Sequence, residues 1–112
     1  MLPELDVARV GRWAEQRVPD HARDQVRVEL DVDARSITIL ECRPPWAHDR
    51  SGDGWTRAPI ARLRYTKSRG EWALYWRDRN LKFHRYDFIQ PSPNVADLIA
   101  EIDRDPTGIF GG

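Results

Sequence analysis

The stretch VRVELDV, residues 26–32, alternates apolar and charged side chains without interruption. On an extended chain, one side then carries all of its apolar members: Val26, Val28, Leu30 and Val32. This period of two predicts a strand with one buried and one wet face, as is typical of antiparallel sheets. Residues 33–36 have the composition of a turn, and a second strand containing Ile37 and Ile39 follows. The chain is therefore expected to fold around an antiparallel sheet.

Three further strands are expected at about 58–66, 71–77 and 81–86. Helices are indicated where apolar side chains recur at helical spacing, at 3–18 and at about 93–104. Pro19 stops the first helix, and Pro106 lies just beyond the second. We predict one α+β domain over residues 1–112: an antiparallel sheet of about five strands, flanked by an N-terminal and a C-terminal helix.

A chain of 112 residues is long enough to bury a core without metal or disulfide staples. Cys42 is its only cysteine, so an internal disulfide framework is excluded. The first residues lack the basic and apolar regions of a signal peptide, and no apolar run approaches the roughly 20 residues of a membrane span. We expect a cytoplasmic protein with no membrane partner.

Charge is unevenly distributed, although 18 basic residues balance 18 acidic ones. The segment from Trp55 to Asp87 has nine Arg or Lys and three Asp or Glu, a net charge of +6, whereas each flank has a net charge of −3. Only Lys67 and Lys82 are lysines. The functional interpretation of this arginine excess is that arginine suits bidentate contacts with phosphate. The alternative interpretation is that the arginine excess reflects genomic base composition.

The pairing register of the last three strands decides which side chains share a face. A four-residue loop at 67–70 sets Thr66 opposite Glu71, and an even-length loop is expected near 79–80. An odd-length second loop would bury a lysine and a histidine at a cost of several kcal/mol. The predicted buried face carries Ala61, Leu63, Tyr65, Trp72, Leu74, Trp76 and Phe83. The predicted outer face, the candidate binding face, carries Arg62, Arg64, Tyr75, Arg77, Lys82, His84 and Tyr86.

The outer face is not expected to be wholly polar, because the same parity places four other side chains there: Leu40, Cys42, Ile60 and Ala73. Part of this face could be covered by a helix or another chain. Large aromatic side chains are expected to anchor the core: Trp13, Trp72 and Trp76. Trp46 and Trp55 differ because they flank a polar loop at about 47–57, where they either staple the loop or form an aromatic lip for a partner.

Metal, cofactor and catalytic motifs are not indicated. The only soft ligands show no metal-binding spacing: His21, His48, His84 and Cys42. The loop that begins at Asp49 echoes a calcium loop, but its twelfth position is Ile60 rather than a bidentate glutamate. Cys42 lies near His48 in sequence, which does not establish catalytic geometry. We expect no catalytic residue, no metal and no cofactor.

Several segments resemble an uncharacterised bacterial family, domain of unknown function 3024. They are RPPW at 43–46, PIARLRY at 59–65, WALYW at 72–76, HRY at 84–86 and DPTGIFG at 105–111. Against the family pattern, Leu81 stands where a turn glycine is usual, Phe83 where a tryptophan is usual, and Gly111 where an aromatic is usual. The resemblance implies no known activity, cofactor or active site.

The sequence leaves two functional hypotheses. The first is a non-enzymatic module that binds a protein partner or a second copy through the outer face and the loop bounded by Trp46 and Trp55; it is motivated by apolar Leu40, Ile60 and Ala73. The second is binding of RNA or single-stranded DNA by the basic and aromatic outer face. A small-toxin type of RNase is a variant of the second, with His84 as general base by residue type. The sequence favours a non-enzymatic role.

Overall fold

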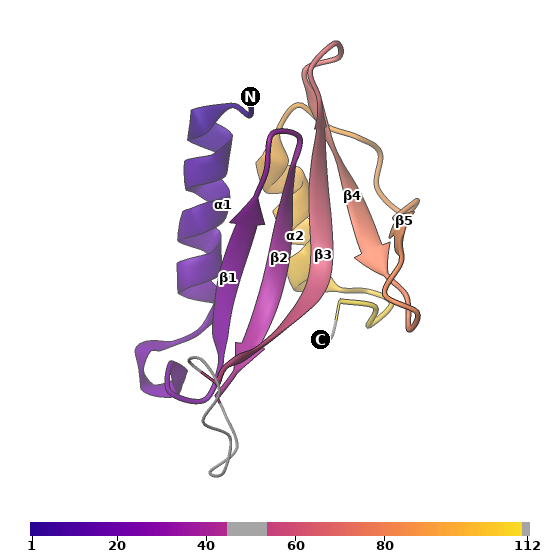
Figure 1. Ribbon diagram of the computed structural model, residues 1–112. Coiled ribbons are helices and arrows are strands. Elements are labelled where there is room, and N and C mark those ends of the chain that lie inside the picture. Colours follow the sequence, from indigo (N-terminus) through magenta and orange to yellow (C-terminus); the bar gives the residue numbers. More distant parts are fainter. Residues whose placement is uncertain (45–53, 111–112) are drawn as a thin grey trace.

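The computed structural model describes residues 1–44 and 54–110 of the chain. Its elements, in order, are α1 (Glu4–Arg17), the 3-10 helix η1 (Asp20–Ala22), β1 (Arg27–Val32), β2 (Ser36–Arg43), β3 (Thr56–Thr66), β4 (Glu71–Arg77), β5 (Phe83–Arg85) and α2 (Val95–Arg104). The strands form one sheet in the order β1-β2-β3-β4-β5, and every neighbouring pair is antiparallel. The predicted α+β fold is confirmed (Figure 1).

The two helices begin and end for different local reasons. The helix α1 has no side-chain cap; Pro3 precedes its first turn, and the chain turns extended at Val18. The helix α2 is capped by Asn94, whose side chain accepts a hydrogen bond from the amide of Ala96. It ends at Asp105, which adopts a left-handed conformation with φ of 40°. No helix in the described ranges is long and apolar enough to cross a membrane.

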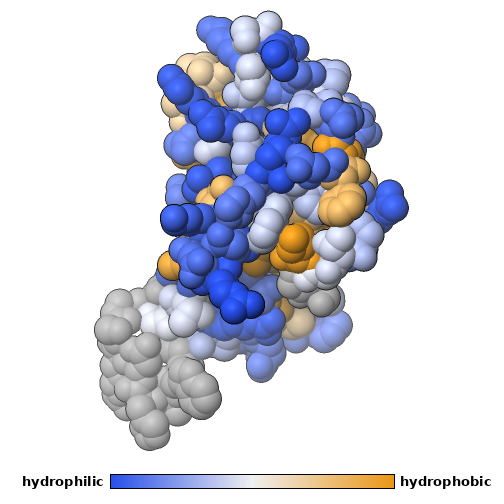
Figure 2. Space-filling model, turned by 90° about the vertical axis from the view of Figure 1, so that its right-hand side faces the viewer, coloured by the Kyte–Doolittle hydropathy of each residue, from blue (hydrophilic) through white to orange (hydrophobic). Residues whose placement is uncertain are grey.

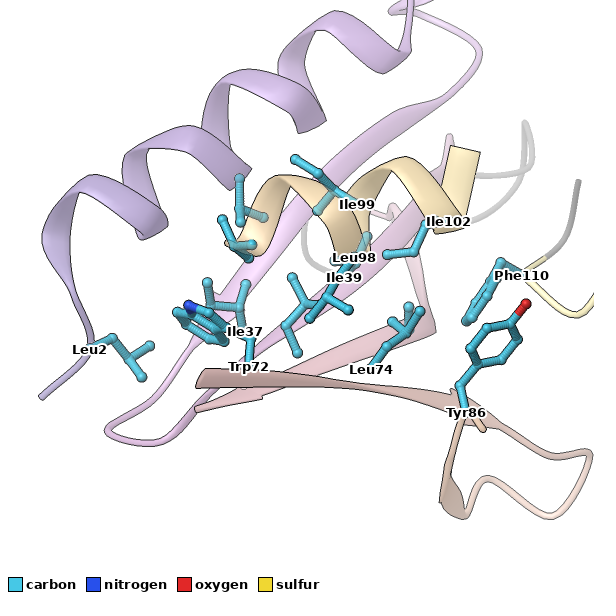
Figure 3. Close-up of a cluster of buried hydrophobic side chains, with 14 residues drawn as sticks. Leu2, Ile37, Ile39, Trp72, Leu74, Tyr86, Leu98, Ile99, Ile102 and Phe110 are labelled. Atoms are coloured by element: carbon cyan, nitrogen blue, oxygen red, sulfur yellow. The ribbon is translucent and has the colours of Figure 1, made fainter. Parts of the chain in front are cut away.

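Both helices pack on the same face of the sheet, here called the inner face. The helix α1 lies against β1, and α2 lies against β4 and also contacts α1. Figure 3 shows side chains of α2 directed toward those of the central strands. The buried cluster between them consists of Leu2, Val10, Ile37, Ile39, Ala61, Leu63, Trp72, Leu74, Tyr86, Val95, Leu98, Ile99, Ile102 and Phe110. Trp72 is fully buried as expected, whereas Trp13 and Trp76 are half-buried at the margin of the cluster.

The hairpin of β3 and β4 has the predicted register. Thr66 pairs with Glu71 and Tyr65 with Trp72, so the loop has four residues. The hairpin of β4 and β5 does not, because Arg77 pairs with Phe83 across a loop of residues 78–82. The prediction of an even-length loop is therefore wrong. An odd-length loop moves each β5 side chain to the opposite face from the one expected.

The odd-length loop is tolerated because β5 is a three-residue edge strand whose inner-side residue, His84, is not buried. His84 lies on the inner side, yet its side chain is 47% exposed. Its Nε2 is 2.6 Å from Oδ2 of Asp78, and its ring lies 4.9 Å from that of Trp76. The desolvation that argued against this register is thus avoided, since the imidazole is solvated and also has a carboxylate partner.

A bulge in β3 alters a second prediction. Ile39 pairs with Ala61 but Leu40 pairs with Pro59, which leaves Ile60 as an extra residue. Ile60 packs against the buried cluster, so its assignment to the outer face is wrong. Leu40 keeps the outer position that alternation along β2 assigns to it, and it is half-buried.

Candidate nucleic-acid interface

The outer face is the side of the sheet opposite α1 and α2, and no described helix packs on it. Register places Thr38, Arg62, Tyr75 and Arg85 in one row across four strands. The row on one side of it holds Ser36, Arg64 and Ala73. In the row on its other side, still on the outer face, Arg77 pairs with Phe83. Figure 2, seen from the side where β4 and β5 lie, shows a mostly hydrophilic surface with separate hydrophobic spots.

Arg62 lies at the centre of the outer face and is held from two sides. Its Nε donates a hydrogen bond of 2.9 Å to Oγ1 of Thr38 on β2. Its guanidinium carbon lies 4.0 Å from the ring centroid of Phe83 on β5, which is within cation–π range. A planar group fixed by a hydrogen bond and a stacking contact loses little further entropy when it binds an anion.

Four arginines of the outer face are not neutralised by ion pairs with the acidic flanks of the chain, whereas Arg57, farther along β3, pairs with Glu29. Within residues 1–44 and 54–110, no ion pair is formed by Arg62, Arg64, Arg77 or Arg85. Nearby carboxylates have other partners: Glu29 pairs with Arg57 at 3.0 Å, and Glu71 lies 4.0 Å from Arg69. The outer face of β3, β4 and β5 therefore has an excess of positive charge.

The turn between β1 and β2 adds a further arginine at one end of the outer face. Oδ1 of Asp33 accepts hydrogen bonds of 2.8 Å from the amides of Arg35 and Ser36, and Oδ2 accepts one of 2.9 Å from the Ser36 hydroxyl. These hydrogen bonds, that from the Arg35 amide foremost, hold the pKa of Asp33 below its usual value. The Asp33 side chain thus closes the turn by hydrogen bonds and fixes the backbone that carries Arg35.

Three of the predicted face residues lie elsewhere. Lys82 is exposed in the turn between β4 and β5, and His84 lies on the inner side. Tyr86 is buried, and its hydroxyl donates a hydrogen bond of 2.7 Å to Oε2 of Glu101 on α2. Burial and this hydrogen bond raise the pKa of Tyr86 to about 12. The common cause of these misplacements is the odd-length loop, whereas Arg62, Arg64, Tyr75 and Arg77 share the outer face.

The same loop brings to the outer face two residues that sequence reasoning missed. Phe83 was expected in the core but instead lies over the Arg62 guanidinium. Arg85 pairs with Tyr75 and is exposed. The loop length would have identified both, but residues 78–82 contain no glycine to mark the turn. The signal lies in the family pattern instead, where a turn glycine is usual at position 81: Leu81 adopts a left-handed conformation there, with φ of 68°.

The tryptophan loop can be followed only in part. Trp46 and residues 47–53 lie outside the described residues. Trp55 is half-buried, and the Arg27 guanidinium carbon lies 4.0 Å from its ring centroid. The Trp55 side chain therefore packs against Arg27, at the end of the outer face that holds the ion pair of Glu29 and Arg57.

Cys42 is a buried side chain of the outer face and has no exposed surface. Burial first, and the Glu29 carboxylate second, raise the pKa of its thiol. A raised pKa keeps the thiol protonated, which is the opposite of what a cysteine nucleophile requires. His48 lies outside the described residues. Among those that are described, no group of three or more His, Cys, Asp or Glu side chains could hold a metal ion.

Fold and face together define a small α+β domain with two helices on one side of an antiparallel sheet and an uncovered, arginine-rich face on the other. The chain belongs to the family described as domain of unknown function (DUF3024), whose pattern matches residues 2–112. The family resemblance found in the sequence is thus confirmed and extends over nearly the whole chain. No curated protein and no solved structure matches the chain significantly.

Proposed function

We propose that this domain binds single-stranded nucleic acid, RNA or DNA, on its outer face. The observation that carries the proposal is the set of arginines without ion-pair partners in the described chain, Arg62, Arg64, Arg77 and Arg85, on a face that no described helix covers. Backbone phosphates are the polyanion that such spaced guanidinium groups suit. The proposed setting is the cytoplasm.

Aromatic side chains among the arginines favour a single strand over a duplex. Tyr75 lies between Arg62 and Arg85 in the register, and Phe83 lies beside Arg62. Unpaired bases can stack on such rings, and each stacked base contributes about 1–3 kcal/mol. An antiparallel sheet that presents aromatic and basic side chains together is an established physical solution to this kind of recognition.

Binding to a protein partner or a second copy is the weaker candidate. Among the large hydrophobic side chains that are most exposed, Val32 is on the inner side of β1, and the others lie outside the strands: Met1, Leu5, Leu81 and Phe88. On the face itself, Ala73 is buried, half-buried Phe83 packs against the Arg62 guanidinium, and Leu40 and Pro59 form a half-buried apolar pair. This pair favours at most a small homodimer contact, which sedimentation velocity would detect; a strict monomer at high concentration excludes it.

RNA cleavage is not included in the proposal. His84, the general base suggested by residue type, lies on the opposite side of the sheet from Arg62 and Arg64. Its Nε2 is engaged with Asp78, and hydrogen bonding from His84 lowers the pKa of that carboxylate. The imidazole of His84 therefore has a structural partner in the turn between β4 and β5, and it lies away from the face proposed to bind nucleic acid.

Fluorescence anisotropy with a labelled, unstructured single-stranded oligonucleotide tests the proposal. The double substitution Arg62→Glu with Arg77→Glu should abolish binding, and log K of the wild type should fall linearly with log salt concentration. The matched control reverses two exposed arginines of α1, Arg9→Glu with Arg12→Glu, and should retain binding. Equal affinity of both double variants would refute the assignment of binding to this face. Thermal melting establishes that each variant is folded.

A further inference from the structure

A hollow of about 380 Å³ lies where the outer face meets the turn between β1 and β2. Its lining consists of Asp33, Ala34, Arg35, Ser36, Arg62 and Arg64. A neighbouring hollow of about 410 Å³ shares Arg35 and Arg64 and adds Lys67. Volumes in this range suit a small charged group and the part of a ligand that follows it.

The three arginines of this hollow come from two elements: Arg35 from the turn between β1 and β2, and Arg62 and Arg64 from β3. The Arg35 backbone is held in the turn by Asp33, and Arg62 is held by Thr38 and Phe83. Arg64 is exposed on β3 and pairs in the sheet with Ser36. Neither Arg35 nor Arg64 forms an ion pair within the described part of the chain.

The charge of the hollow discriminates between kinds of phosphate. Three guanidinium groups and the single Asp33 carboxylate leave two positive charges. A phosphodiester inside a strand carries one negative charge, whereas a terminal phosphate monoester carries about 1.5 to 2 at pH 7 and offers three acceptor oxygens. The Asp33 carboxylate in the lining would also repel a strand that continued past the turn.

We infer that this hollow binds the terminal phosphate of a single strand whose remaining nucleotides lie along the outer face toward Arg77 and Arg85. The identity of the ligand rests on the proposed function. Inorganic phosphate and a nucleoside monophosphate have the same chemistry, so the experiment must separate them from a strand end. Binding of the terminal phosphate in this hollow, here called the terminal-phosphate anchor, gives the nucleic-acid strand a fixed end. Uniform phosphate binding along the face would not provide one.

Isothermal titration calorimetry with three versions of one short oligonucleotide tests this inference: 5′-phosphorylated, 3′-phosphorylated, and hydroxyl-ended at both termini. One phosphorylated version should bind about tenfold or more tightly than the hydroxyl-ended strand, as expected for added charge-assisted hydrogen bonds. Arg35→Gln and Arg64→Gln should each remove this preference. The matched control Arg85→Gln, outside the hollow, should weaken all three versions by the same factor and keep the preference.

The outcomes separate the two proposals. Equal affinity for all three versions would overturn the terminal-phosphate anchor and leave strand binding intact. Failure of every version to bind would overturn the proposed function, and the anchor with it. Amide shifts at Arg35 and Ser36 on addition of inorganic phosphate or a nucleoside monophosphate, without any preference for a phosphorylated end, would overturn the strand-end assignment in favour of a small phosphorylated ligand.

Discussion

Replacing Leu81 should reverse the usual stability order of alanine and glycine. Leu81 has φ of 68° in the turn between β4 and β5, and its side chain is 65% exposed. The left-handed conformation costs a residue with a Cβ about 1–2 kcal/mol, and glycine avoids this cost. Glycine loses about 0.5–1 kcal/mol more than alanine in conformational entropy on folding. Leu81→Gly should therefore be more stable than Leu81→Ala by about 0.5–1 kcal/mol.

The alanine variant is the reference because both substitutions remove the same side-chain contacts. Differential scanning calorimetry should place the melting temperature of Leu81→Gly above that of Leu81→Ala by roughly 2–5 °C for a domain of this size. At exposed Gln16, inside α1, the order should be the ordinary one, with alanine more stable than glycine. A glycine variant no more stable than the alanine variant at position 81 would refute the left-handed turn that sets the register of β5.

Three further predictions concern the core and its attachment to the helices. Tyr86→Phe should lower the free energy of unfolding by about 1.5–3 kcal/mol, because it removes the hydrogen bond to the Glu101 carboxylate; urea titration measures this. The folded pKa of Tyr86 is raised to about 12 from an ordinary value of 10.0, so its contribution should be complete below pH 10 and lost as pH rises through 12; melting temperatures of wild type and Tyr86→Phe should converge over that range. Asp6→Ala removes the acceptor for the Trp72 indole N–H, 2.9 Å away, and should destabilise by about 1 kcal/mol, whereas Asp6→Asn keeps an acceptor oxygen and should destabilise less; a urea midpoint for Asp6→Ala equal to that of the wild type would contradict this.

Much of the fold is readable from the sequence because its signals are local. The helical spacing in 93–104 specifies α2 and its buried face, and the alternation in 26–32 specifies β1. The buried face expected for β1 is only partly realised, because Val28 and Leu30 pack against the buried cluster while Val32, at the end of the strand, is 46% exposed. The four-residue loop at 67–70 then fixes the register of β3 and β4 by parity. Parity also suffices to place Arg62, Arg64, Tyr75 and Arg77 together on the outer face.

The remainder depends on tertiary context that the pattern does not contain. Parity failed at β5 because the inner side of this strand is not buried: His84 lies at a solvated edge beside Asp78. The bulge at Ile60 was not anticipated, although Pro59 inside a strand is a signal for such an irregularity. Arg35 was missed because a turn arginine joins a face only through the geometry that Asp33 imposes.

The central claim, that the outer face binds single-stranded nucleic acid, is tested most directly by mapping amide chemical shifts as an unstructured oligonucleotide is added at low salt. We expect the largest changes on residues of the outer face, with Thr38, Arg62, Ala73 and Tyr75 among them, and little change in α1 and α2. Changes concentrated on the helices, or no changes at an oligonucleotide concentration well above that of the protein, would contradict the claim.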